Sequence, residues 1–186
     1  MRKNFGPQTW CFPMPVLIVC TYDKEGKPNA MNVAWGGIYD YNLIMLSLSE
    51  GHKTYKNILE SGAFTVSFAN EESLVACDYV GIASGNKTKD KMAKAGFTTT
   101  PSECVNAPII NELPLTLECK LNKVNEDGII IGDIINVSSD ESILDSNGKP
   151  DISKMHLISY VSPTHDYVSV GERVVGKAFH SGKALI

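Results

Sequence analysis

The spacing of apolar residues along the chain predicts many short strands. A nearly continuous apolar run over 16–22 predicts a buried strand. A polar turn with glycine and proline follows, and it returns the chain through a second strand over 31–35, so the two form a hairpin. A third strand is expected over 43–49. The clearest period-two alternation lies over 115–122, and a turn containing Asn and Gly connects it to an apolar run over 129–135.

Helices are expected between some of these strands. Apolar residues at i, i+3 and i+4 predict a helix over 53–60 with one buried stripe, made of Tyr55, Ile58 and Leu59. The polar segment 71–96 is expected to be helical with a break at Ser84-Gly85. Two further strands are predicted, a half-buried one over 64–68 and a late one over 167–171. Short strands with inserted helices indicate a closed antiparallel barrel, and no repeat or linker divides the chain, so we expect a single domain over 1–186.

Composition excludes several functional classes. The 186 residues carry a net charge of −4, which argues against binding nucleic acid or an anionic membrane. The five cysteines show no C-x-x-C spacing, so no zinc, iron–sulfur or disulfide framework is expected. We therefore expect a reducing, cytoplasmic setting. The densest basic segment, 87–94, is most simply a solvated helix face, and within it Lys89 and Lys91 are weak candidates for contact with an anionic ligand.

The N-terminus imitates a secretory signal, because Arg2 and Lys3 precede an apolar run over 10–20. However, Pro13 and Pro15 would break the helix that a signal requires. No apolar run reaches the roughly 18–20 residues of a membrane span. We interpret this run as part of the folded structure and expect no membrane association.

Three short segments form a candidate ligand site. The first ends a strand in small residues, the second closes the next strand, and the third opens a helix. Together they offer free backbone amides, small polar side chains and one cation beside a helix N-terminus, which suits a flat, polar-edged aromatic ligand carrying a phosphate. A buried strand end, a solvent-facing strand terminus and an N-cap threonine are the simpler interpretations. The candidate residues are Asn32, Val33, Ala34, Trp35, Ser47, Leu48, Ser49, His52, Lys53 and Thr54.

The order and spacing of these segments resemble the FMN-binding split-barrel family, in its flavin reductase-like branch that includes flavoredoxin. The resemblance covers about 15–183 of the chain. It implies a mainly β, antiparallel split barrel of the Greek-key type with short inserted α-helices. It places the first segment along the flavin ring, the third at the phosphate, and Ser84 and Gly85 near the phosphate or the ribityl chain. It also implies a homodimer whose sites lie at the two-fold interface. His165 and Tyr167 are candidates for the open face of the ring, although a single histidine in a loop is more simply an exposed residue. A helix-capping turn is the simpler interpretation of Ser84-Gly85.

The resemblance implies an FMN-dependent oxidoreductase that passes electrons or hydride from NAD(P)H or a redox partner through bound FMN. Many flavin reductases of this family carry a histidine five residues before the glycine that corresponds to Gly132, whereas this chain has Asp127. That departure weakens the case for NAD(P)H. No residue is assigned a catalytic role, because the flavin supplies the redox chemistry, and no metal is expected. The alternative is a non-enzymatic barrel that stores or senses a flavin, or, with weaker support, haem.

Overall fold

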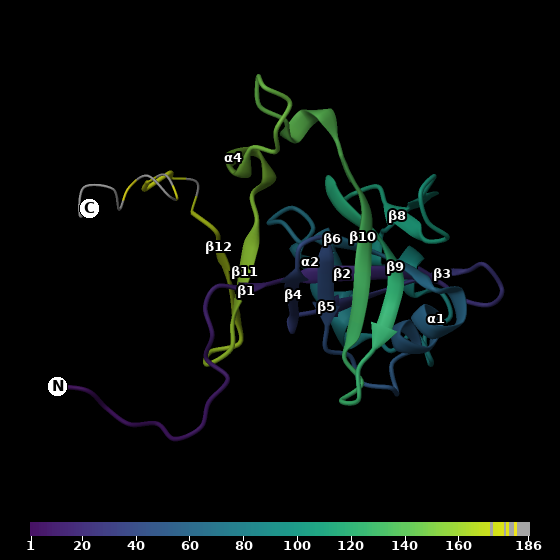
Figure 1. Ribbon diagram of the computed structural model, residues 1–186, viewed down its shortest axis with the longest axis horizontal. Coiled ribbons are helices and arrows are strands. Elements are labelled where there is room, and N and C mark those ends of the chain that lie inside the picture. Colours follow the sequence, from purple (N-terminus) through teal and green to yellow (C-terminus); the bar gives the residue numbers. More distant parts are fainter. Residues whose placement is uncertain (172, 177, 179–180, 182–186) are drawn as a thin grey trace.

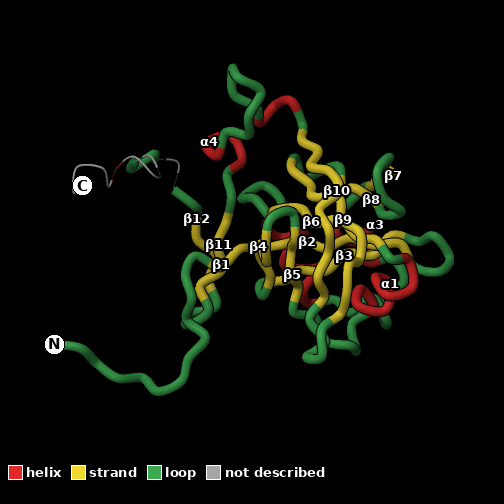
Figure 2. The backbone as a smooth tube through the Cα atoms, in the orientation of Figure 1, coloured by secondary structure: helices red, strands yellow, loops and turns green. Residues whose placement is uncertain are grey.

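The computed structural model describes residues 1–171, 173–176, 178 and 181. Its main element is a seven-stranded antiparallel sheet in the order β3-β2-β6-β9-β10-β5-β4, curled into a half-barrel (Figures 1 and 2). Within the described residues no ladder joins the edge strands β3 and β4. The mainly β split barrel is therefore confirmed, whereas the closed barrel is wrong. The strands are β2 (Leu17–Tyr22), β3 (Pro28–Val33), β4 (Gly36–Asp40), β5 (Leu43–Leu46), β6 (Ala63–Phe68), β9 (Leu115–Val124) and β10 (Ile130–Ser139).

Smaller elements surround this sheet. A three-stranded sheet lies at one end of the molecule, and the N-terminal segment runs away from the barrel beside it (Figure 1). It contains β1 (Met14–Pro15), β11 (Ile158–Val161) and β12 (Asp166–Ser169). A short ladder joins β7 (Thr99–Pro101) to β8 (Pro108–Ile110). The helices are α1 (Lys53–Ser61), α2 (Leu74–Ile82), α3 (Lys91–Ala95), α4 (Ile152–Met155) and the 3-10 turn η1 (Glu141–Ile143). Within the described residues, no helix has the length and apolar character that crossing a bilayer requires.

Strand β2 lies between two apolar cores, which explains its continuous apolar run. Successive side chains of a strand point to opposite faces. Leu17 and Val19 pack inside the barrel with Phe64. Ile18 and Cys20 belong to the second core, which β2 shares with α2 and β11. The prediction of a strand buried on both faces is thus confirmed.

Two predicted strands end earlier than expected. Strand β3 stops at Val33, and Ala34 and Trp35 form a bend. Strand β5 stops at Leu46, so Ser47 already lies outside the ladder. The Ser47 N–H donates to the Trp35 carbonyl at 2.8 Å, next to the Gly36–Leu46 pair that ends the β4–β5 ladder. The Trp35 side chain is 57% exposed and is not a core residue.

Helix α1 has the expected range but a different buried face. Leu59 is 47% exposed, so its place in the buried stripe is wrong. Thr54 and Asn57 are buried instead. The reason is that α1 covers polar positions of the sheet, where the Asn57 amide donates to the Thr21 hydroxyl at 2.9 Å. Buried polar groups need such partners.

Three other predictions change in detail. Strand β6 is buried on both faces rather than half-buried, because Thr65 donates to the Pro108 carbonyl at 2.6 Å on its polar side. The segment 71–96 contains α2 and α3, but its non-helical break runs over 83–90 and is wider than Ser84-Gly85 alone. The late strand is β12, which ends at Ser169 rather than at residue 171.

Candidate functional site

A cavity of about 190 Å³ lies between the start of α1, the end of α2 and the start of α3. Five of the predicted site residues line it, although they come from two separate segments of the chain: His52, Lys53, Thr54, Ser84 and Gly85. We call this space the lysine cavity, because Lys53 and Lys91 both line it. The structure therefore brings together the part of the site that was assigned to a phosphate.

The first turn of α1 opens onto the lysine cavity. The N-cap of this helix is His52, and its side chain makes no capping hydrogen bond. Thr54 lies inside the first turn, so the simpler interpretation of Thr54 as an N-cap is wrong. An uncapped first turn leaves backbone N–H groups and the positive end of the helix dipole available to an anion.

Asn29 on β3 fixes the hydroxyl of Thr54. The Asn29 amide donates to Thr54 Oγ1 at 2.9 Å, and both side chains are buried. Since Thr54 accepts in this bond, its own hydroxyl proton remains available for a ligand. Gly85 lies directly against the same asparagine, and a Cβ there would come within 2.1 Å of Asn29 Oδ1. Only glycine lets this segment approach so closely.

Lys53 is oriented by an ion pair. Its ammonium lies 2.8 Å from the Asp23 carboxylate, in the turn between β2 and β3. Burial on its own would raise the pKa of Asp23, but hydrogen bonds from Lys53 and from the N–H groups of Lys27 and Glu25 hold that pKa below its ordinary value. Asp23 is therefore ionised at neutral pH and keeps Lys53 at the rim of the lysine cavity.

Lys91, at the start of α3, is only 5% exposed. Among the described residues no group accepts a hydrogen bond or forms an ion pair with its ammonium. Burial, together with the like charge of Lys53, lowers the pKa of Lys91 to about 8. The nearby Cys20 thiol offers no counter-charge, because burial raises its pKa to about 12. A buried charge without a partner is costly, and a bound anion would supply that partner.

A second cavity, of about 390 Å³, adjoins the first. Gly81 and Ile82 at the end of α2 line both spaces. Its other walls are Asn32 and Ala34 from the end of β3, Asp78 from α2, and Tyr160, His165 and Tyr167 from β11, β12 and the turn between them. We call it the aromatic cavity. We refer to these two adjoining spaces together as the track. It has a cationic end and an aromatic end, which suits a phosphorylated ligand with a flat ring.

The remaining predicted residues lie outside both cavities. Trp35 and Ser47 are joined only by their backbone bond. Val33 and Leu48 belong to the barrel core. Ser49 is exposed, and its carbonyl accepts from the N–H of the N-cap histidine of α1 at 3.0 Å. Their assignment to the flavin ring stays a prediction.

Sequence reasoning missed part of the site. Asn29, Asp78 and Tyr160 were not predicted, and Lys91 was only a weak candidate. The lysines of 87–94 all look alike in the sequence. Only packing shows that Lys91 is buried, whereas Lys94 of the same helix is exposed and paired with Asp90.

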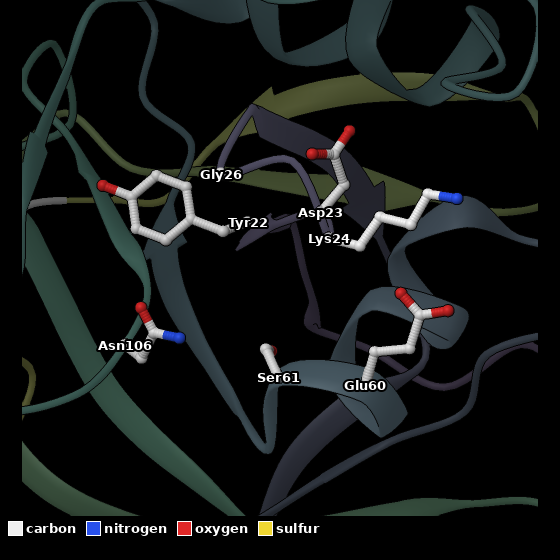
Figure 3. Close-up of a pocket in the computed structure, with 7 residues that line it drawn as sticks. All are labelled: Tyr22, Asp23, Lys24, Gly26, Glu60, Ser61 and Asn106. Carbon is white, nitrogen blue, oxygen red and sulfur yellow. The ribbon is translucent and has the colours of Figure 1, made fainter.

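A larger hollow, of about 580 Å³, lies elsewhere on the surface (Figure 3). None of the predicted site residues lines it. Its Asp23 carboxylate is already occupied by Lys53 and backbone N–H groups. We therefore do not assign the cofactor to this hollow, despite its size. Its lining residues are Tyr22, Asp23, Lys24, Gly26, Glu60, Ser61 and Asn106.

Comparisons with known proteins show the family and the fold of this chain. Residues 9–152 match the family model described as flavin reductase like domain. The flavoredoxin of Desulfovibrio vulgaris (Miyazaki F) superposes with a TM-score of 0.94 at 39% identity, covering 98% of this chain and 100% of that chain. The flavoredoxin of Methanosarcina acetivorans gives 0.90 at 30% identity, with both chains fully covered. An uncharacterised protein of Archaeoglobus fulgidus is 33% identical over 132 residues, 68% of this chain and 73% of that protein.

The unpartnered Lys91 ammonium gives a prediction about stability. Replacing it with methionine should raise the free energy of unfolding of the flavin-free protein by about 1–3 kcal/mol, because a buried charge is removed. In the wild type, the folded pKa of about 8 lies below the ordinary 10.5. The unfolded state then binds more protons, so stability should rise from about pH 8 to pH 10. Urea denaturation measures both effects.

Lys94→Met is the matched control for this experiment. Lys94 is exposed on the same helix, so its replacement should change the free energy of unfolding by less than about 0.5 kcal/mol. A Lys91→Met protein less stable than the wild type would show that the ammonium has a favourable partner in the flavin-free state.

Proposed function

The chain belongs to the flavin reductase-like family, in its flavoredoxin branch, and we propose that it is an FMN-dependent oxidoreductase. In this proposal FMN lies along the track formed by the two cavities, with its phosphate in the lysine cavity and its ring toward the end of β3. When bound, FMN supplies the hydride and electron chemistry. The protein holds it, orients it and leaves one face open.

The buried Lys91 ammonium is the observation that carries the proposal. A phosphate monoester brings roughly −1.5 to −2 charges and three acceptor oxygens. The lysine cavity offers two ammonium groups, a hydroxyl proton on Thr54 and the N–H groups of the first turn of α1. Charge-assisted hydrogen bonds of this kind are the stronger ones in proteins. The proposed phosphate supplies the charge that Lys91 lacks.

The electron source is the second part of the proposal. Asp127, at the position where related reductases were expected to carry a histidine, is exposed in the turn between β9 and β10 and lines neither cavity. The residue type at this position, together with the likeness to two flavoredoxins, supports a reduced electron carrier as the donor in preference to NAD(P)H.

We also propose a homodimer. Strand β4 is an edge of the main sheet and exposes Ile38 and Tyr39, at 70% and 53%. Trp35 is exposed in the bend before it. Trp10 and Phe12 are exposed on the N-terminal segment that runs away from the barrel (Figure 2). An apolar edge strand usually pairs or is covered in the native state. A second copy of the chain would cover it.

The phosphate assignment is tested by comparing FMN with riboflavin. Hydrogen bonds to a charged group contribute about 1.5–3 kcal/mol each, so Lys53→Ala or Lys91→Met should weaken FMN by about tenfold or more. Riboflavin has no phosphate and should change little. Fluorescence titrations of both ligands into both variants and into Lys94→Met measure the difference.

The same titrations carry a pH dependence. Protonated Lys91 is the form that binds phosphate, so the advantage of FMN over riboflavin should fall as the pH rises above about 8. Equal losses of affinity for the two ligands would show that these lysines contact the ring or stabilise the fold. The phosphate assignment would then be wrong.

The electron source is tested by anaerobic mixing of the FMN-loaded protein with one donor at a time. Dithionite or a reduced electron carrier should bleach the flavin absorbance, whereas NADH and NADPH should bleach it slowly or not at all. Rapid bleaching by a nicotinamide would make the protein a flavin reductase. A flavin that no biological donor reduces would support the storage alternative.

The dimer is tested by light scattering of the FMN-loaded protein. The wild type should have twice the mass of one chain at micromolar concentration. Ile38→Lys places a charge on the edge strand and should shift the mass toward one chain, because burying an unpaired ammonium is unfavourable. Leu59→Lys, at an exposed site on α1, is the control. A wild-type monomer with FMN bound would rule the dimer out.

A further inference from the structure

Tyr160 and His165 form a hydrogen-bonded pair in the wall of the aromatic cavity. The Tyr160 phenol oxygen lies 2.6 Å from His165 Nδ1. Both residues line the cavity. His165 is in the turn between β11 and β12 and is exposed, so its imidazole can exchange protons with solvent. The pair thus connects solvent to the cavity interior.

The two tyrosines of this cavity have different partners. The Tyr167 hydroxyl donates to the Asp78 carboxylate at 2.7 Å, and burial together with that carboxylate raises the pKa of Tyr167. Tyr167 therefore keeps its proton. Tyr160 faces an imidazole, whose ring nitrogens can both accept and donate protons. Tyr160 is consequently the phenol that can release a proton and be reprotonated.

We propose that Tyr160 and His165 are the proton-donating pair of this site and serve the reduction of a small conjugated carbonyl compound in the aromatic cavity. The inference rests on the proposed function, because the electron pair comes from reduced FMN. When bound and reduced, FMN would supply the hydride for a C–H bond at the β-carbon, where the C=C π bond breaks. The Tyr160 proton forms the second C–H bond at the α-carbon. The substrate gains two electrons and the cofactor loses two, and His165 returns a solvent proton to Tyr160.

The chemistry of the pair favours this substrate class. Oxygen and nitrogen atoms exchange protons with water quickly and need no positioned acid. Carbon does not, so a built-in acid matters most where a proton must reach carbon. The cavity walls are apolar at Ala34 and Ile82. The centroids of the Tyr160 and Tyr167 rings lie 5.9 Å apart. Such walls suit a small, flat, uncharged molecule, and the Asp78 carboxylate disfavours an anionic one.

The test begins with FMN-loaded protein that is reduced with a stoichiometric amount of dithionite under anaerobic conditions and then mixed with 2-cyclohexenone. We expect the flavin colour to return, with saturated ketone as the product. In D₂O, one deuterium should appear at the α-carbon. Tyr160→Phe should slow the return of colour by on the order of 100-fold. His165→Gln should slow it as well, because glutamine cannot return a proton to Tyr160.

Three controls keep the result specific. His156→Gln changes an exposed histidine that pairs with Glu72 outside both cavities, and it should behave as the wild type. Reoxidation by oxygen should be equal in all variants. The dissociation constant of FMN should change less than about threefold in Tyr160→Phe and His165→Gln.

Several outcomes would overturn the proposal. Reduced wild-type protein that reacts with oxygen but not with 2-cyclohexenone would exclude this substrate class. A wild-type rate of reoxidation by 2-cyclohexenone in Tyr160→Phe would leave the pair a purely structural role. Loss of FMN affinity in the variants would show that the pair holds the ring. A wild-type chain that binds no FMN would instead refute the proposed function, and this inference with it.

Discussion

The candidate site depends on a layer of buried and partly buried polar contacts between α1 and the β2–β3 hairpin. The Asn57 amide donates to Thr21, the Asn29 amide donates to Thr54, and Lys53 pairs with Asp23. Apolar packing would hold a helix on a sheet without fixing its rotation closely, whereas these bonds have directions. They set where the first turn of α1 points, and that turn opens into the lysine cavity.

The lysine cavity also contains a side chain that lowers the stability of the flavin-free protein. Lys91 is buried without a partner among the described residues, and a methionine would fill its place at lower cost in the flavin-free protein. Groups that break local rules of stability are expected at functional sites. The position of Lys91 opposite the open helix end is consistent with a ligand that carries negative charge, as the flavin-binding family would require.

The two ends of the track belong to different parts of the molecule. The cationic end is built on the main sheet through α1 and on α3. The aromatic end depends on β11 and β12, which lie in a separate sheet. The Tyr167–Asp78 bond joins that sheet to α2, 89 residues away in the chain.

The sequence by itself determined the elements with strong periodicity. It gave the range of α1, the β9–β10 hairpin and the burial of β2, because local spacing follows directly from the geometry of helices and strands. The family resemblance identified the residues at the start of α1 and in the Ser84-Gly85 segment that meet in the lysine cavity. It did not place Asp78 or Tyr160.

Tertiary structure alone decided the rest. The sheet stays open between β3 and β4, which no ladder joins within the described residues although only Ala34 and Trp35 separate them in the chain. Only the packing of α3 buries Lys91 and leaves Lys94 exposed, although both are lysines of one short helix. Burial and partnership depend on contacts between residues far apart in the chain, and a local pattern carries no information about those contacts.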